Sequence, residues 1–322
     1  MKHLLREVKA DFHCHGPWPF WREPKEPFKK FKQRAIDYYS PQRNLDSLLN
    51  AYLPKTKEGH VAIGMGTYIQ NRYRDLVSSL LDKEEQARIK ARFGLRDIDL
   101  SSWQYFFGFK TSADTEFYVI NAHEPHLPGG HLLLLPISKR IEPTLEESGV
   151  MRYKTPREIA EEAKTDFSTL VLVPHPGIDL NIIEKLALLA VNEPAWKKLG
   201  LTYEESKTLA EDGLIDGVEV HNTFAGKHNK EISNTGLRLM QEFGLVGFAS
   251  SDTEYPDNVL TSHTIMNLDF SDPLNLRKSI IASPRFPYSD CLIRGHLPHH
   301  FSSGMQHILL NFFVRGRDRS IQ

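Results

Sequence analysis

The chain has 322 residues, of which 40% are hydrophobic and 25% are charged, and its formal net charge is −1. This ordinary globular composition allows one large α/β domain or two smaller ones, and a charge near zero gives no general attraction for nucleic acid. The two cysteines exclude a disulfide framework and suit a reducing compartment. Charged residues interrupt the N-terminal apolar run almost at once, which argues against a signal peptide, and no apolar run approaches the roughly 20 residues of a membrane span. We therefore expect a cytoplasmic protein without membrane contact.

Short apolar, β-rich runs alternate with segments of helical periodicity. The first predicted strand ends at residues 13–15, and the others are residues 61–63, 117–120, 132–135, 170–173, 217–220 and 246–249. The predicted helices are residues 74–92, 156–164, 182–191, 203–211 and 232–243. Thr155 and Pro156 mark the start of the second helix, and Gly244 marks the end of the last. This alternation predicts a parallel sheet or a closed barrel, with functional groups at the C-terminal ends of the strands.

The first predicted strand ends in Asp11-Phe12-His13-Cys14-His15. Because side chains alternate along a strand, His13 and His15 are expected on one face and Cys14 in the core on the other. A matched pair of imidazoles at a strand end is half of a metal site.

More histidines and acids lie at or beside predicted strand ends. They are Glu124, His131, His175, Glu219, His221, Asp252 and Glu254. A barrel would bring these positions together at one rim, so the sequence predicts a metal site there.

Four segments together resemble the successive motifs of the polymerase and histidinol phosphatase (PHP) family. They are Asp-Phe-His-Cys-His at 11–15, Val-Pro-His-Pro-Gly at 173–177, Gly-Val-Glu-Val-His-Asn at 217–222 and Ala-Ser-Ser-Asp at 249–252. Their order and spacing hold from about residue 8 to residue 265. The resemblance implies a distorted seven-stranded, TIM-like (β/α) barrel and metal-dependent hydrolysis of phosphate esters, with three metals in the full form of the family.

Carried over by motif, the resemblance implies two metal sites that share one bridging carboxylate. The first would be held by His13, His15, Glu124 and Asp252, and the second by Glu124, His131 and His175. Two such cations bind a bridging hydroxide that attacks phosphorus in line, while their charge stabilises the transition state. Imidazole and carboxylate ligands suit Zn²⁺, Mn²⁺ or Fe²⁺.

The chain departs from the family at the third metal. The second predicted strand continues through 64–68 without a histidine, and the last motif ends in Asp252-Thr253-Glu254 where the family has a histidine at the last position. Either the third site is lost and two metals remain, which we favour, or Glu23 and Glu254 rebuild it with oxygen ligands.

Glu219 and His221 have open roles. Glu219 is expected to point inward, as a third-metal ligand or, as we prefer, as a group that orients a histidine. His221 is a candidate general acid for the leaving oxygen or a wall of the pocket. His60 and His263, which could compensate for the missing histidines, are expected to be structural or surface residues.

Candidate phosphate-binding residues follow the motifs in loops. They are Arg22, Lys227, His228 and Arg285. The basic segment 25–34 contains interleaved phenylalanines and could track a nucleic-acid backbone, but it also contains acids, and we interpret it as a charged surface helix.

We expect a barrel domain over residues 1–290, with insertions near 71–107 and 192–212. A C-terminal extension over 291–322 is expected on or near the barrel. The aromatic run 103–107 is expected to pack in the core rather than form a partner surface.

The sequence therefore predicts a metal-dependent phosphoesterase, either a phosphatase or a phosphodiesterase or nuclease, with two or three divalent ions. Its substrate would be a small phosphate ester, a nucleotide or a nucleic-acid end, and the neutral charge favours the smaller molecule. One alternative is an amidohydrolase-type barrel that hydrolyses C–N or ester bonds, but the close pair Glu124 and His131 argues against it. Another alternative is a degenerate barrel that binds without turnover, but the retained candidate ligands argue against it. Neither an oligomeric state nor a partner protein is predicted.

Overall fold

A six-stranded mixed sheet forms one half of the fold. The computed structural model describes residues 5–15, 41–66, 72–125, 127–178, 199–223, 228–252 and 259–283. The strands of this sheet are Arg6–Cys14 (β1), His60–Gly66 (β2), Leu95–Asp99 (β3), Phe106–Thr111 (β4), Glu116–Ala122 (β5) and Thr264–Leu268 (β12). Their order is β12-β1-β2-β5-β4-β3. The three central strands β1, β2 and β5 are parallel, and β12, β4 and β3 are added antiparallel.

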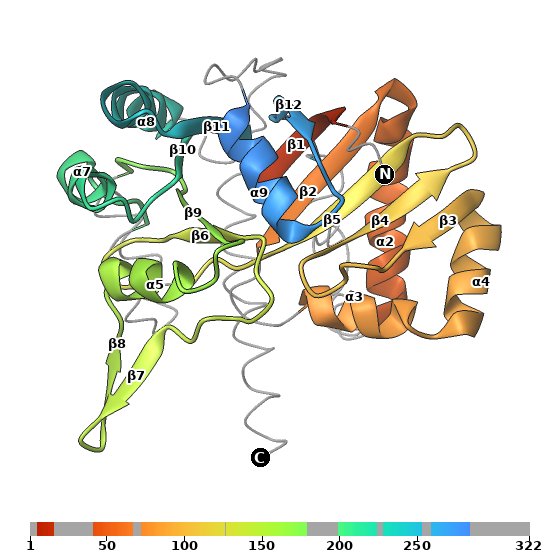
Figure 1. Ribbon diagram of the computed structural model, residues 1–322, viewed down its shortest axis with the longest axis horizontal. Coiled ribbons are helices and arrows are strands. Elements are labelled where there is room, and N and C mark those ends of the chain that lie inside the picture. Colours follow the sequence, from red (N-terminus) through yellow and green to blue (C-terminus); the bar gives the residue numbers. More distant parts are fainter. Residues whose placement is uncertain are drawn as a thin grey trace, which may run out of the picture.

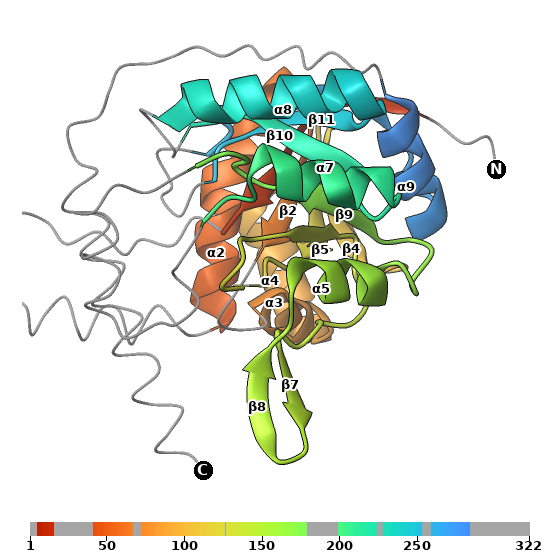
Figure 2. The same ribbon diagram turned by 90° about the vertical axis from the view of Figure 1, so that its left-hand side faces the viewer.

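A four-stranded sheet forms the other half. Its strands are Leu133–Leu135 (β6), Leu170–Val173 (β9), Gly217–Asn222 (β10) and Val246–Ser250 (β11). The order is β11-β10-β9-β6, with β6 antiparallel to β9 and the other pairs parallel. A separate hairpin, Thr144–Glu147 (β7) with Val150–Tyr153 (β8), projects from the body of the molecule (Figure 2).

The two sheets meet at two seams and enclose a common core. At one seam His123 and Leu134 exchange two backbone hydrogen bonds of 2.9 Å, and at the other the Asp252 amide donates to the His13 carbonyl at 2.8 Å. Apolar side chains of both sheets, such as Phe248, pack in the space between them. The predicted α/β class is confirmed. The predicted closed barrel is not found in the described part of the chain, because the strand ladders break at both seams and antiparallel strands extend the first sheet.

Helices cover the outer faces of both sheets (Figure 1). They are Pro41–Tyr52 (α2), Arg72–Leu80 (α3), Lys83–Phe93 (α4), Pro156–Ala163 (α5), Tyr203–Glu211 (α7) and Asn229–Phe243 (α8), with a 3-10 turn at Leu53–Glu58 (η1). A further helix, Pro273–Ala282 (α9), packs Leu276 and Ile280 against the core between the sheets. Leu76 is among the residues that pack α2, α3 and α4 onto the first sheet, and Leu239 is among those that pack α5, α7 and α8 onto the second. Within the described ranges, no helix combines the length and the apolar character needed to cross a bilayer.

Local signals in the sequence place most helix ends correctly. Thr155 caps α5 in a reciprocal capping box, and α8 ends at Gly244 in the left-handed conformation. The prediction of a single helix over 74–92 is wrong. The side chain of Asp82 accepts hydrogen bonds from two backbone amides and caps a new helix, α4, after α3 has ended. The predicted helix 182–191 lies outside the described residues.

The predicted insertion 71–107 adds strands as well as helices. It contains α3, α4 and β3 and runs into β4, the antiparallel neighbour of β5. Phe106 packs in the core between the sheets, and Phe107 packs under the outer helices, so the end of the aromatic run lies in the core as predicted. In the second predicted insertion, 192–212, the described part contains α7. The predicted C-terminal extension 291–322 lies outside the described residues.

Gly64 lies in β2 where a side chain has no room. A Cβ atom at this position would lie 2.2 Å from the carbonyl oxygen of Phe12 in β1. Because that oxygen belongs to the backbone, we expect Gly64→Ala to lower the free energy of unfolding by about 1–3 kcal/mol or more. Gly66→Ala is a matched control in the same strand, since the nearest atom to its Cβ would be the flexible end of Leu133, at 3.2 Å, and its nearest backbone atom would lie at 4.0 Å. Denaturant unfolding measures both variants, and equal stabilities would contradict this packing.

Candidate metal centre

A bulge near the end of β1 sets the direction of the first two histidines. Between Asp11 and Cys14, three steps along β1 match two steps along β2. His13 within the bulge and His15 just after it lie together, with ring centroids 5.3 Å apart. Cys14 faces the opposite core, where its Sγ lies 2.9 Å from the hydroxyl of Tyr52. The alternation expected after His13 is therefore present.

Glu124 lies at the centre of four histidines. It follows the end of β5, and its side chain is buried. Its Oε1 lies 3.5 Å from His13 Nε2, 3.0 Å from His131 Nδ1 and 3.3 Å from His175 Nε2. Its Oε2 lies 3.4 Å from His15 Nε2. The two oxygens of one carboxylate thus face different histidines.

Asp252 completes the group from the end of β11. Its Oδ1 lies 3.3 Å from His13 Nε2 and 3.1 Å from His15 Nε2. The bond from its amide to the His13 carbonyl holds it against β1. All six side chains that the sequence predicted as ligands of two metals therefore lie in one cluster.

The distances within the cluster fit divalent cations. Metal–nitrogen and metal–oxygen bonds of about 2.0–2.2 Å place two ligands of a tetrahedral ion roughly 3.3 Å apart. Three sets of ligand atoms each lie within 4.8 Å of one another: His13, His15 and Glu124; Glu124, His131 and His175; and His13, His175 and Asp252. Within the described chain, the buried Nε2 of His13 makes no hydrogen bond, although oxygens of Glu124 and Asp252 surround it. An imidazole nitrogen placed in this way fits a metal ligand.

Two of the six side chains belong to residues with a left-handed backbone. The φ angle is 31° at His175 and 48° at Asp252. Such conformations cost a residue other than glycine about 1–3 kcal/mol, and they concentrate at functional sites. Each residue lies two positions after the buried end of a strand, β9 or β11, so the turn there directs its side chain into the cluster.

The charges in the cluster are coupled. Burial opposes a charge on His13, but the carboxylates of Asp252 and Glu124 raise the pKa of His13 well above its usual value. The same carboxylates overcome burial to raise the pKa of His15, whereas burial lowers the pKa of His131. Against burial, the histidines lower the pKa of Asp252 to about 2 and that of Glu124 well below its usual value. Both acids are therefore ionised at neutral pH, as ligands of a cation must be.

Glu219 forms a second layer behind the histidines. Its side chain is wholly buried in β10, and it accepts hydrogen bonds from the backbone amide of His175 and the hydroxyl of Ser250. Its Oε1 lies 3.4 Å from His13 Nδ1, on the side of the ring away from the cluster. A carboxylate in this place fixes the tautomer and orientation of an imidazole that binds a metal through its other nitrogen.

Two further residues of the second layer were not singled out from the sequence. Asp11 accepts hydrogen bonds from the amide and the hydroxyl of Ser251, next to Asp252. Burial raises the pKa of Asp11 to about 7. Asn222 donates to both Glu219 and Asp252. Asp11 belongs to the segment that carries His13 and His15, and Asn222 belongs to the segment that carries Glu219. Their position within those segments was the only signal available.

Several other candidate residues lie outside the described residues, so their places in the site stay predictions. They are Arg22, Glu23, Lys227, Glu254 and Arg285.

Four histidines that were considered from the sequence lie outside the metal-ligand sets found in the described part of the chain. His221 follows Glu219 on β10 and is half-buried, and burial lowers its pKa. His228 lies directly before α8. His60 lies at the start of β2, which is the end of the strand away from the cluster, and its Nδ1 accepts a hydrogen bond of 3.2 Å from the Glu116 amide. His263 Nδ1 lies 3.3 Å from the Leu260 carbonyl oxygen.

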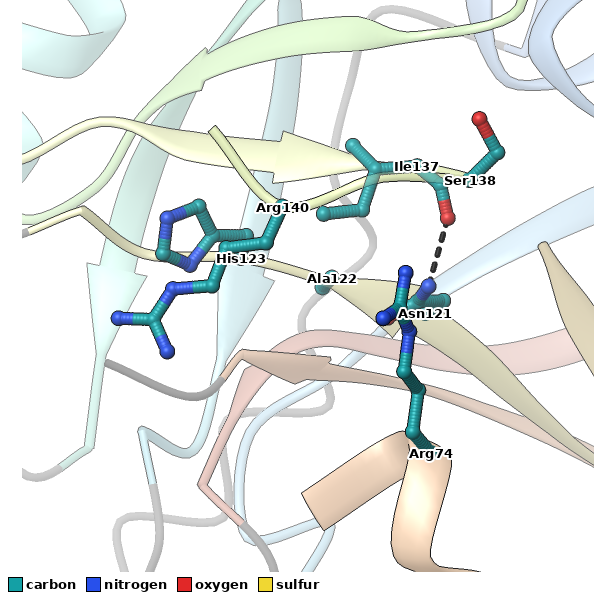
Figure 3. A pocket seen from close by; sticks show the side chains of 7 residues that line it. All are labelled: Arg74, Asn121, Ala122, His123, Ile137, Ser138 and Arg140. Carbon is teal, nitrogen blue, oxygen red and sulfur yellow. Dashed lines mark hydrogen bonds between the residues drawn. The ribbon is translucent and has the colours of Figure 1, made fainter. Parts of the chain in front are cut away.

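Apart from the metal cluster, a polar pocket lies at the seam between β5 and β6 (Figure 3). It is lined by Arg74, Asn121, Ala122, His123, Ile137, Ser138 and Arg140. The Asn121 side chain donates to the Ile137 carbonyl at 2.7 Å, and His123 Nε2 lies 2.9 Å from the Ile141 carbonyl oxygen. None of the six candidate ligands is among its lining residues, so this pocket is separate from the metal cluster.

Comparisons with known proteins give no family assignment. No protein-family model and no curated protein matches the chain. Among solved structures, it is similar to PsfC from Pseudomonas syringae PB-5123, with 11% identity and a TM-score of 0.45 over 97% of this chain and 99% of that one. It is also similar to a two-domain protein from Bacteroides vulgatus ATCC 8482 that contains a predicted PHP-like metal-dependent phosphoesterase. There the identity is 14% and the TM-score 0.39, over 86% of this chain and 62% of that one. Likenesses this weak carry no functional argument.

The fold and the cluster together define an α/β protein with a buried group of histidines and carboxylates that could bind metal ions.

Proposed function

We propose that the chain is a metal-dependent hydrolase of phosphate esters with a two-metal centre. One ion would be held by His13, His15, Glu124 and Asp252, and the other by Glu124, His131 and His175. The observation that carries the proposal is the position of Glu124. Its Oε2 faces His15, while its Oε1 faces His131 and His175 and also lies 3.5 Å from His13 Nε2. A carboxylate that reaches the histidines of both sets is suited to bridge two cations.

The ligand set restricts the metals and the chemistry. Four imidazoles and two carboxylates suit Zn²⁺, Mn²⁺ or Fe²⁺. When bound, such ions act as Lewis acids on a phosphoryl oxygen. They also lower the pKa of a bound water molecule, so that hydroxide is available at neutral pH. The protein holds its ligands on strand ends that are fixed to the core, and the burial of the cluster limits competition from bulk water.

The proposal assigns the described ligands to two ions, which agrees with the third-site histidines that the sequence lacks. The proposed substrate is a small phosphate ester or nucleotide, and the candidate phosphate-binding residues are Arg22, Lys227, His228 and Arg285. His221 is a candidate proton donor to the leaving oxygen, since it lies on the strand that carries Glu219.

Hydrolysis assays on protein loaded with Mn²⁺ or Zn²⁺ test this proposal. We expect turnover of phosphomonoesters or phosphodiesters that disappears after chelation and returns when the metal is restored. His60→Ala is a matched control for loss of a histidine, because His60 lies outside the cluster. Hydrolysis of amides or carboxylic esters, with none of phosphate esters, would favour the amidohydrolase-type alternative. Metal binding without turnover of any substrate would favour a degenerate binding protein.

A further inference from the structure

Asn222 connects two carboxylates behind the metal cluster. Its side chain is wholly buried at the end of β10. Its Nδ2 donates to Glu219 Oε2 at 3.1 Å and to Asp252 Oδ2 at 3.0 Å. A side-chain amide has two N–H groups on this nitrogen, so both donors of Asn222 are used on the two acids.

A bulge in β10 makes this connection possible. Between Glu219 and His221 the register with β11 shifts, so that two steps on β10 match one step on β11. Without the shift, residues 219 and 222 would point to opposite faces of the strand, because side chains alternate. With it, the side chains of Glu219 and Asn222 lie within hydrogen-bond distance of each other.

The hydrogen bonds assign a separate task to each oxygen of Asp252. Oδ2 accepts from Asn222, and Oδ1 lies 3.1–3.3 Å from the Nε2 atoms of His15 and His13. Only Oδ1 is directed to the space where an ion would be held. Asp252 is therefore arranged to bind through one oxygen.

The same hydrogen bonds keep Glu219 in the second layer. Its Oε2 accepts from Asn222 and from the His175 amide, and its Oε1 accepts from Ser250 and faces His13 Nδ1. Both oxygens are thus engaged with donors of the protein. This arrangement speaks against Glu219 as a ligand of a third metal.

We propose that Asn222 is a positioning residue that makes Asp252 a one-oxygen ligand and holds Glu219 behind His13 as a hydrogen-bond partner. The proposal rests on the proposed two-metal function. It predicts that loss of Asn222 affects one ion more than the other, because Asp252 belongs to the ion held with His13 and His15. In the proposed assignment, neither Asp252 nor Asn222 is a ligand of the ion that Glu124, His131 and His175 would hold.

The test is a titration of the metal-free protein with Mn²⁺, followed by calorimetry and by the electron paramagnetic resonance signal of free Mn²⁺. We expect Asn222→Ala to weaken one of two binding steps by about 10–100-fold, as loss of a second-layer partner commonly does, and to leave the other step unchanged. Asn222→Ser provides a second variant if the alanine protein does not fold. A hydroxyl has a single hydrogen and cannot bridge both acids, so the same step should weaken.

Asn121→Ala is a matched control. Asn121 is also a buried asparagine with two hydrogen bonds, which it donates to the carbonyls of Gln104 and Ile137, but it touches none of the candidate ligands (Figure 3). Its loss should lower stability while both Mn²⁺ steps stay as in the wild type. Equal weakening of both steps in the Asn222 variants, or no weakening, would overturn the positioning role while the two-metal function stands. A wild-type protein that takes up no Mn²⁺ would overturn the two-metal function itself.

Discussion

Glu124→Ala should remove both metal ions and abolish hydrolysis. Glu124 contributes one oxygen toward His15 and the other toward His131 and His175, so its loss takes a ligand from both proposed sites at once. The variant also leaves four buried imidazoles without the carboxylate at their centre. We expect less than one ion per chain and a fall in kcat/KM of about a thousandfold or more, which corresponds to roughly 4 kcal/mol of transition-state stabilisation.

A comparison with His131→Ala makes this prediction specific. His131 faces only Oε1 of Glu124, on the side shared with His175. Its replacement should remove one ion and leave the ion held by His13, His15 and Asp252. Metal analysis of the two variants beside His60→Ala, with circular dichroism to check the fold, measures the difference. Retention of both ions by Glu124→Ala would show that Glu124 does not bridge.

Metal removal should change the pH dependence of stability. In the metal-free protein the pKa of His13 and that of His15 are raised, so the stability these residues contribute is fully present below their usual pKa of about 6.5 and is lost as the pH rises through the raised values. Asp252 and Glu124, whose pKa values are lowered, contribute stability above about pH 4 that is lost as the pH falls. The pKa of His131 is lowered, so the folded state favours its neutral ring, and the contribution of His131 to stability is larger at higher pH.

Bound metal should counteract the loss of stability that the metal-free protein shows as the pH rises. Ions replace protons on the histidines, so metal affinity rises with pH. We expect the gain in Tm from metal to grow between about pH 6 and pH 8. The gain in the free energy of unfolding should reach about 2.7 kcal/mol per site where free metal exceeds Kd by roughly 100-fold. Thermal unfolding with and without a chelator across this range measures the gain. A difference in Tm that does not depend on pH would contradict the coupling of metal and protons on His13 and His15.

The six clustered side chains could be predicted because their signal is local. Five of them lie at or just after the end of a buried, β-rich run, and such ends meet at one edge of parallel strands. His131 instead precedes its run, and it reaches the same edge because β6 is antiparallel to β9. The helix ends at Thr155 and Gly244 could be predicted for the same reason, because caps act within a few residues.

The remaining features lack such a local signal. The antiparallel strand β12 pairs with β1 at the other end of the described chain, so its place depends on a distant segment. Strands β3 and β4 each pair with the next strand along the chain, but nothing in their own pattern distinguishes them from loop or insertion. The bulges in β1 and β10 also appear only when the neighbouring strand is in place. Asn222 reaches Glu219 through such a bulge, so its role was hidden from a reading based on strict alternation.

Metal content per chain is the measurement that tests the central claim most directly. Protein purified without chelator and without an affinity tag, then analysed for its elements before and after incubation with Mn²⁺ or Zn²⁺, should carry two divalent ions per chain. The same analysis of Glu124→Ala should fall below one. A wild-type protein that is free of metal and takes up neither ion would contradict the account.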